Sequence, residues 1–255
     1  MQKLISIDLK SDFGFFRKPD ANNTINLSYN MLHKPALLGI LGAILGLEGY
    51  KEKGKFPEYY HKLKDLPIGI EPLNHEKGNF QKIVIKYTNT VGYANDGSNY
   101  LTEEATLIKP SYRIYLLVDL EIREQQNLFE YLKNGQTEYI PYFGKNEFHL
   151  WWDTDDFIDH NFEKSNVLNS SYKVASLFLK RGIVKDQKED VFDLFNFQNI
   201  EVPFIYFERL PVGFNEEIIQ YDLGEFVYTT FNLKKEYILE NLYMLKNSGH
   251  YVQLN

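Results

Sequence analysis

The sequence has no cysteine among its 255 residues. This absence excludes a disulfide scaffold, a cysteine-ligated zinc or iron–sulfur site and a thiol nucleophile, and it is compatible with a reducing compartment. A long apolar run is also absent, since the longest, Pro35–Leu47, has 13 residues, whereas about 20 are needed to cross a bilayer. Because Asp8, Lys10 and Asp12 interrupt the N-terminal segment, we expect no signal peptide, no membrane contact and a cytoplasmic location.

The sequence patterns of several enzyme classes are missing or incomplete. There is no G-x-S-x-G nucleophile elbow. Gly49–Lys55 has the spacing of a P-loop, but Phe56 stands where a hydroxyl residue would bind magnesium. His149–His160 is rich in His and Asp, yet its spacing matches no established metal loop. We interpret these segments as a basic and an acidic surface loop, and we predict no catalytic residue, metal or cofactor.

Aromatic residues, in contrast, are abundant, with 19 Tyr, 19 Phe and 2 Trp. They can build a large core and still leave rings for stacking on bases or sugars. The net charge of −7 argues against a free-standing nucleic-acid binder. The charge is uneven, however, because residues 1–64 carry a local +4 and the remainder carries −11. This asymmetry predicts one anion-facing surface and one surface for other partners.

Hydrophobic periodicity predicts an α+β fold whose N-terminal domain has the ferredoxin-like β-α-β-β-α-β order. We expect strands at 4–9, 82–87, 112–120 and 148–152, and helices at 35–47 and 124–134. In the first helix, Gly39, Gly42 and Gly46 share one face. This face predicts a close approach of the helix backbone to a sheet or a ligand.

The remaining segments are expected to decorate this core. Residues 49–80 are interpreted as an insertion with a helix at 57–66, and residues 88–106 as a β-hairpin arm with a turn at 95–98. We place a domain boundary between 1–155 and 156–255 and expect the second part to be β-rich. Its expected strands are 172–179, 202–208 and 225–232, with a hairpin at 247–249, whereas 234–246 fits a strand or a helix.

One N-terminal constellation points to nucleic acid. Cations and rings alternate in Phe13–Asp20, and Tyr29 and His33-Lys34-Pro35 follow at the expected start of a helix. Helix N-termini and cations bind phosphates, and rings stack on bases. The alternative is that the rings belong to the core and the cations form a solvated rim.

Five segments form a recognisable series along the chain: Ile7–Pro19, His33–Gly46, Ile108–Tyr115, Tyr139–Phe148 and Glu208–Pro211. The second is a proline-initiated helix with spaced glycines, and the fourth contains Pro-Tyr-x-Gly-x-x-Glu-Phe. In this order they resemble the CRISPR-associated Cas-five family of the RAMP superfamily, closest to its type I-B members. Many members carry Ser or Thr after the helix-opening proline, where this chain has Ala36.

This resemblance implies a ferredoxin-like RAMP fold and a non-catalytic subunit of a type I CRISPR interference complex (Cascade), which defends against foreign DNA. Such a subunit caps the 5′ handle of the crRNA. It contacts the backbone subunit through a thumb, here about 88–106, as well as the large subunit, and meets target DNA only through the complex. The residues implied to bind RNA are Arg17, Lys18, Tyr29, His33, Lys34, Tyr112, Arg113, Lys145 and Asn146.

Two alternatives remain open at this stage. One branch of the same family cuts repeat RNA without metal, which needs a general base, a general acid and a cation near the phosphate. Tyr50, His33 and Lys34 are the candidates for those roles. The other alternative is a β-rich module that binds carbohydrate or peptide through its aromatic residues.

Overall fold

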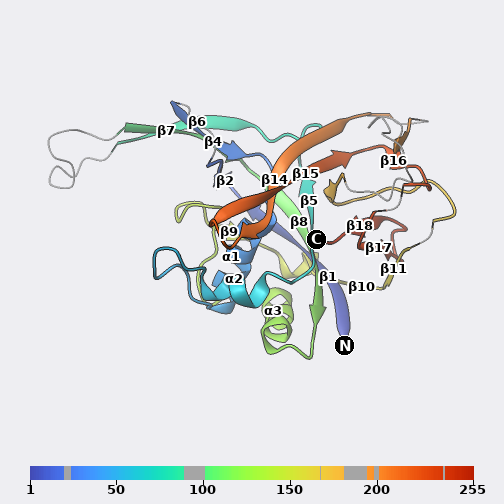
Figure 1. The fold of residues 1–255 in the computed structure, drawn as a ribbon, viewed down its shortest axis with the longest axis horizontal. Coiled ribbons are helices and arrows are strands. Elements are labelled where there is room, and N and C mark those ends of the chain that lie inside the picture. The colour runs from blue at the N-terminus through green and yellow to red at the C-terminus, as the bar shows by residue number, and fades with distance from the viewer. Residues whose placement is uncertain (20–23, 89–100, 167, 181–193, 198–200, 238) are drawn as a thin grey trace.

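The computed structural model describes residues 1–19, 24–88, 101–166, 168–180, 194–197, 201–237 and 239–255. The fold is α+β, with many strands and few helices (Figure 1), as the periodicity predicts. No helix in these residues is long and apolar enough to cross a membrane.

The central sheet is antiparallel and has the order β10-β1-β8-β5. Its long middle strands are β1 (Gln2–Ser11) and β8 (Ser111–Asp119). They are flanked by β5 (Ile68–Leu73) and β10 (Ile158–His160), and β9 (Leu150–Trp151) pairs with the end of β1. In β1, Ile5, Ile7 and Leu9 enter the main core, because alternate side chains of a strand point to the same face.

Two of the expected strands are corrected by this sheet. Residues 82–87 do form a strand, but it lies in a second sheet, and β5 from the expected insertion takes the place beside β8. Because β5 is buried on both faces and contains Gly69 and Pro72, it shows no alternating pattern. The strand expected at 148–152 shrinks to β9, and β10 supplies the other edge pairing of β1.

Helices α1 (Lys34–Leu45) and α3 (Arg123–Asn134) confirm the two expected helices. Each ends at a glycine with positive φ, Gly46 at 71° and Gly135 at 66°, a backbone conformation that glycine adopts without a Cβ clash. The short helix α2 (Glu58–Leu63) confirms the helix expected near 57–66 and packs against α1. The apolar α1 is buried because it lies between the sheet, α2 and α3.

A second sheet carries the arm at the left of Figure 1. Its central strand β7 (Leu101–Ile108) pairs with β6 (Lys82–Thr88) on one side. On the other side lie β2 (Phe13–Gly14) and β4 (Ile25–Tyr29), and β3 (Phe16–Arg17) pairs with β4. The expected hairpin at 88–106 therefore has β6 and β7 as its strands and begins earlier than expected. Residues 89–100 lie outside the described part.

The described part of residues 161–255 contains strands and no α-helix. A long curved ribbon of β14 (Ile205–Asn215) and β15 (Gln220–Thr229) crosses above α1 (Figure 1). Residues 234–246, except 238, form turns and a strand. The other strands are β11 (Phe162–Lys164), β12 (Phe178–Leu179), β13 (Phe195–Asn196), β16 (Asn232–Leu233), β17 (Leu242–Leu245) and β18 (Tyr251–Gln253); a 3-10 turn spans Thr154–Asp156.

The main core joins both halves of the chain. Leu177, Leu210 and Phe226 from the C-terminal half pack in the same cluster as α1 and β1. Two smaller clusters lie within the C-terminal strands and between them and the outer face of the central sheet. The boundary at residue 155 stays a prediction, and the two halves share one core.

Gly42 and Gly39 of α1 differ in the space available for a side chain, so the same substitution at both positions tests how closely the helix is packed. A Cβ at Gly42 would lie 2.5 Å from the Tyr59 Cβ, whereas a Cβ at Gly39 would lie 3.7 Å from the Tyr59 ring. We expect Gly42→Ala to destabilise the fold by about 1–3 kcal/mol through overpacking. Gly39→Ala should be neutral or stabilising by up to about 1 kcal/mol. Urea denaturation checks both, and equal effects would contradict the close packing at Gly42.

Candidate nucleic-acid interface

A groove of about 760 Å³ runs beside α1. Helix α1 contributes small residues to it, namely Ala36, Gly39 and Ala43. These residues are three or four positions apart and therefore share one face of the helix. The glycines of α1 thus serve two purposes: Gly42 admits the Tyr59 side chain of α2, and Gly39 lines the groove without a side chain.

Aromatic rings make up much of the groove's lining. They come from β3, the loop after α1, helix α2, the loop after α3 and the β14–β15 ribbon; the rings are Phe16, Tyr50, Tyr59, Tyr139, Tyr142, Phe214 and Tyr221. Tyr50 and Tyr139 each expose 60% of their surface, and Tyr142 exposes 40%. Exposed rings around one groove are suited to stack on the unpaired bases of a single strand.

The tyrosine hydroxyls of this groove are neutral donors. Burial raises the pKa of the Tyr59, Tyr50 and Tyr221 hydroxyls, so they stay protonated at neutral pH. The rings of Tyr50 and Tyr59 meet edge to face with centroids 6.4 Å apart. A protonated hydroxyl can donate to a base carbonyl or a phosphate oxygen.

Cations lie on the loop at one end of the groove. Lys51 lines the groove and pairs with Glu48, and Lys55 pairs with Glu52 at 2.6 Å. Both are exposed pairs, which contribute little to stability and can exchange for another anion. Lys53 is exposed and forms no ion pair with the described residues. This loop is the segment with P-loop spacing, and its lysines offer charge to a phosphate backbone.

Two of the nine implied RNA-binding residues are exposed beside the groove. Arg17 follows the groove residue Phe16 and forms no ion pair within the described part of the chain. Asn146 is exposed two residues after Gly144, which also lines the groove. Neither side chain lines the groove itself, so a contact with a ligand there is an expectation for both.

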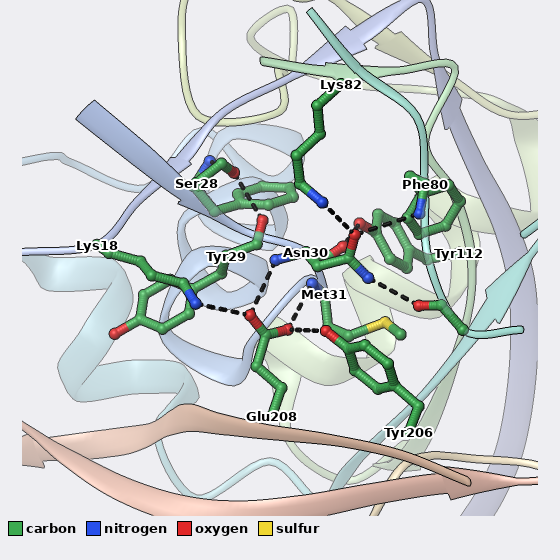
Figure 2. A network of polar contacts seen from close by, with 12 residues as sticks. Lys18, Ser28, Tyr29, Asn30, Met31, Phe80, Lys82, Tyr112, Tyr206 and Glu208 are labelled. Carbon is green, nitrogen blue, oxygen red and sulfur yellow. Dashed lines mark hydrogen bonds and ion pairs between the residues drawn. The ribbon is translucent and has the colours of Figure 1, made fainter. Parts of the chain in front are cut away.

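Lys18 instead points to a buried carboxylate (Figure 2). Its Nζ lies 3.0 Å from Glu208 Oε1, and the Glu208 side chain exposes only 7% of its surface. Glu208 also accepts hydrogen bonds from the backbone N–H groups of Asn30 and Met31, each at 3.1 Å, and from the Tyr206 hydroxyl at 2.9 Å. The network attaches strand β14 to the segment that follows β4.

Asn30 extends the same network into the core (Figure 2). Its side-chain oxygen accepts from the Phe80 N–H at 3.2 Å and from Lys82 Nζ at 2.9 Å. Its side-chain amide donates to the Gly78 carbonyl at 2.7 Å. The fully buried Tyr112 donates its hydroxyl hydrogen to the Asn30 carbonyl at 2.8 Å. Tyr112 is therefore a core residue and has no surface that could contact RNA.

The rings of Tyr29 and His33 are buried too, with centroids 5.1 Å apart. His33 caps α1, because its Nδ1 accepts the Ala36 N–H at 3.3 Å. Burial lowers the pKa of His33 to about 3, so the ring is neutral at physiological pH and offers no charge to a phosphate.

Three other predicted RNA-binding cations form hydrogen bonds or ion pairs within the protein; they are Lys34, Arg113 and Lys145. Lys34 Nζ donates to the backbone oxygen of Asn255 at 2.9 Å, and burial lowers its pKa to about 8. Arg113 forms a bidentate pair with Asp8, at 2.6 and 2.8 Å. Lys145 lies 2.7 Å from Glu104 and 3.7 Å from the centroid of the Tyr87 ring. These cations link strands and loops in the structure.

Most of the groove residues carry no signal in the sequence. Tyr50 is a candidate only for RNA cleavage, and Tyr59, Tyr139, Tyr142 and Tyr221 have no individual prediction. Tyr139 and Tyr142 lie in the fourth resembling segment, which was a usable signal. Tyr221 comes from the ribbon and had none, because its place depends on tertiary packing.

The acidic segment 149–160 has no metal-like arrangement. Within the described residues, no three His, Asp or Glu side chains are grouped as ligands would be. Two of its aspartates form ion pairs instead: Asp156 with Lys10 and Asp159 with Lys3, both at 2.6 Å. The expectation of a surface loop is corrected in part, because β9 and β10 in this segment pair with β1 of the central sheet.

Comparison with known proteins relates the chain to others by fold alone. No protein-family model and no curated protein matches its sequence. A chain from the structure of the type III-B Cmr-beta bound to cognate target RNA and AMPPnP has a TM-score of 0.50 at 14% identity, over 99% of both chains. A CRISPR protein from Archaeoglobus fulgidus has a TM-score of 0.50 at 12% identity, over 98% of this chain and 97% of that one. The chain therefore shares its fold with CRISPR-associated proteins.

The Glu208 network can be tested by its stability. We expect Glu208→Ala to cost about 3–5 kcal/mol of unfolding free energy, because it leaves the Lys18 ammonium without its buried partner. The control is Arg209→Ala, an exposed neighbour on the same strand, which should change the unfolding free energy by no more than about 0.5 kcal/mol. Chemical denaturation measures both, and similar small losses would contradict a structural role for Glu208.

The buried His33 predicts acid sensitivity. Between pH 6.5 and about 3 the unfolded chain protonates this ring while the folded chain keeps it neutral. Stability should therefore fall by up to about 1.4 kcal/mol per pH unit through this residue alone. His33→Asn keeps a capping acceptor without the titration, so its unfolding free energy should fall less between pH 6.5 and 4. Parallel slopes for the two proteins would show that His33 is accessible to protons in the folded state.

Proposed function

We propose that this chain is a non-catalytic, crRNA-binding subunit of a type I CRISPR interference complex, and that its tyrosine-lined groove holds the 5′ handle of the crRNA. The observation that carries the proposal is the groove itself, where exposed rings, neutral donors and a basic loop surround a stripe of small residues on α1. Those are the features that single-stranded RNA needs, with stacking platforms for bases and cations for phosphates.

The fold supports the same class of protein. Two helices cover one face of an antiparallel sheet with the order β10-β1-β8-β5, and the chain order β1-α1-β5-β8-α3-β10 corresponds to the ferredoxin-like pattern. We therefore interpret the central unit as a RAMP-type ferredoxin-like domain. The fold shared with CRISPR-associated proteins agrees with this interpretation.

The five segments that resemble the Cas-five family also lie close together in space. The Tyr112 ring of the third segment lies 6.3 Å, between centroids, from the Phe16 ring of the first. Phe16, α1 and the loop around Tyr142 line one groove. Glu208, from the fifth segment, binds Lys18 of the first. Segments far apart in sequence thus meet at one site, which supports assignment to this family and to its type I-B members. In that assignment the chain also contacts the backbone and large subunits, and it meets target DNA through them.

Non-cleaving binding is favoured by the surroundings of the three residues considered for RNA cleavage. Tyr50 lines the groove. His33, however, is buried and neutral as a helix cap, and Lys34 is bound to the Asn255 backbone oxygen. Metal-independent cleavage needs an acid and a base at the same phosphate. Tyr50 alone does not supply both, so we propose binding without cleavage.

The groove rings can be tested with end-labelled crRNA repeat and the full chain, alone and co-expressed with its complex. We expect a native-gel shift that requires the 5′ handle, and no cleavage on a denaturing gel with or without EDTA. Tyr50→Ala and Tyr142→Ala should each weaken binding by about 1–3 kcal/mol per stacked base. Phe207→Ala, which removes an exposed ring outside the groove, should not. Cleavage that persists in EDTA, or equal effects of all three changes, would overturn the proposal.

The exposed Arg17 is expected to act through the salt dependence of RNA binding. Arg17→Ala should lower the slope of log affinity against log salt by about 0.7, the value for one lost phosphate contact on single-stranded RNA. Arg209→Ala, another exposed arginine, should leave the slope unchanged, and Tyr50→Ala should lower affinity at an unchanged slope. An unaltered slope for Arg17→Ala would remove this residue from the RNA surface.

A further inference from the structure

The arm strand β6 has an open edge. Its only strand partner in the described part of the chain is β7, which on its other side pairs with β2 and β4. Figure 1 shows β6 and β7 extending away from the helices. The side chains of Ile83 and Val84 are both 47% exposed although they point to opposite faces. Strand β6 is therefore accessible at its edge and on both faces.

The pairing with β7 identifies which backbone groups are free. The Ile108 N–H donates to the Gln81 carbonyl at 2.9 Å, and Lys82 stands opposite Leu107. In an antiparallel pair the residues alternate between facing the partner and facing away. The odd-numbered residues of β6 thus bond to β7, and the N–H and C=O groups of Lys82, Val84 and Lys86 point outward. An unpaired row of this kind is a template for another strand.

The charges on β6 restrict which strand would pair there. Lys82 and Lys86 lie on one face of β6, and the strand has no acidic residue. Two copies of β6 placed edge to edge would bring these lysines together, and like charges on adjacent strands destabilise the pairing. Lys86 exposes 75% of its side chain and pairs only at the surface with Glu103, so it can also meet a carboxylate from outside. The opposite face offers Ile83 and Ile85.

We propose that β6 binds a strand of a second protein by β-strand addition, and that this strand alternates acidic side chains, one of them facing Lys86, with apolar side chains facing Ile83 and Ile85. Backbone hydrogen bonds to the outward groups provide the affinity, and the charged face selects the partner. The inference deepens the proposed function, because it states how this subunit contacts a neighbouring protein of its complex.

The test uses the full chain and a seven-residue peptide that alternates glutamate and valine. We expect this peptide to bind and to slow hydrogen exchange at the Val84 and Lys86 amides. The same peptide with lysine in place of glutamate should not bind. Absence of protection at these amides, or equal binding of both peptides, would overturn the inference.

Variants of β6 distinguish the contribution of its backbone hydrogen bonds to peptide binding from that of its side chains. Val84→Pro removes an outward N–H without touching the bonds to β7, as proline allows on a strand edge, and should weaken the glutamate peptide about tenfold or more. Val84→Thr keeps the N–H and should bind like the original chain. Lys86→Glu leaves the backbone intact and should reverse the preference between the two peptides. Unchanged binding by Val84→Pro, or an unchanged preference in Lys86→Glu, would contradict strand addition with this charge pattern.

Failure of the β6 inference can be distinguished from failure of the proposed RNA-binding function. Val84→Pro should bind handle RNA as the original chain does, because β6 lies outside the groove. If the peptide binds with the expected pattern and the RNA does not bind, the proposed function fails, whereas the inference that β6 binds a partner strand is supported. If RNA binds and the peptide does not, only the inference about β6 fails.

Discussion

The buried carboxylate of Glu208 is the contact on which the rest of the site depends. It joins β14 to the segment after β4 through Lys18, the Asn30 and Met31 amides and the Tyr206 hydroxyl. A carboxylate removed from water is tolerated only where cations and donors surround it. Together with Leu210 and Phe226 in the main core, this network holds the β14–β15 ribbon across α1. The ribbon then brings Phe214 and Tyr221 to the groove.

Helix α1 meets two opposing demands. It must be apolar to fill the space between the sheet and the other helices, yet one stripe must stay small. Gly42 lets α2 approach, and Gly39 with Ala36 and Ala43 leaves the groove open. Interior glycines cost a helix about 1 kcal/mol each relative to alanine. At Gly42 that cost is offset by the close packing of Tyr59, whereas at Gly39 it is not offset by packing.

Local sequence patterns predict where the helices and strands lie along the chain. They predict less well which strands and side chains are in contact in the folded protein. The alternation in β1 and β8, the proline at the start of α1 and the glycine after α3 are local signals, and the elements lie where these signals indicate. Strand β5 was missed because burial on both faces removes its alternation. Lys34, Arg113 and Lys145 carry charge as the family resemblance implies, but their partners Asn255, Asp8 and Glu104 are far away in sequence. Pairing of this kind depends on tertiary structure, so it could not be inferred from local patterns.

The central claim is that single-stranded handle RNA lies in the groove beside α1. The most direct measurement is photo-crosslinking of handle RNA that carries 4-thiouridine at successive positions, followed by mapping of the attached peptides. The account predicts crosslinks in the segments that hold Tyr50, Tyr142 and Tyr221, which are separate in sequence and adjacent only at the groove. Crosslinks confined to the opposite face of the central sheet, around Asp8 and Arg113, would contradict it.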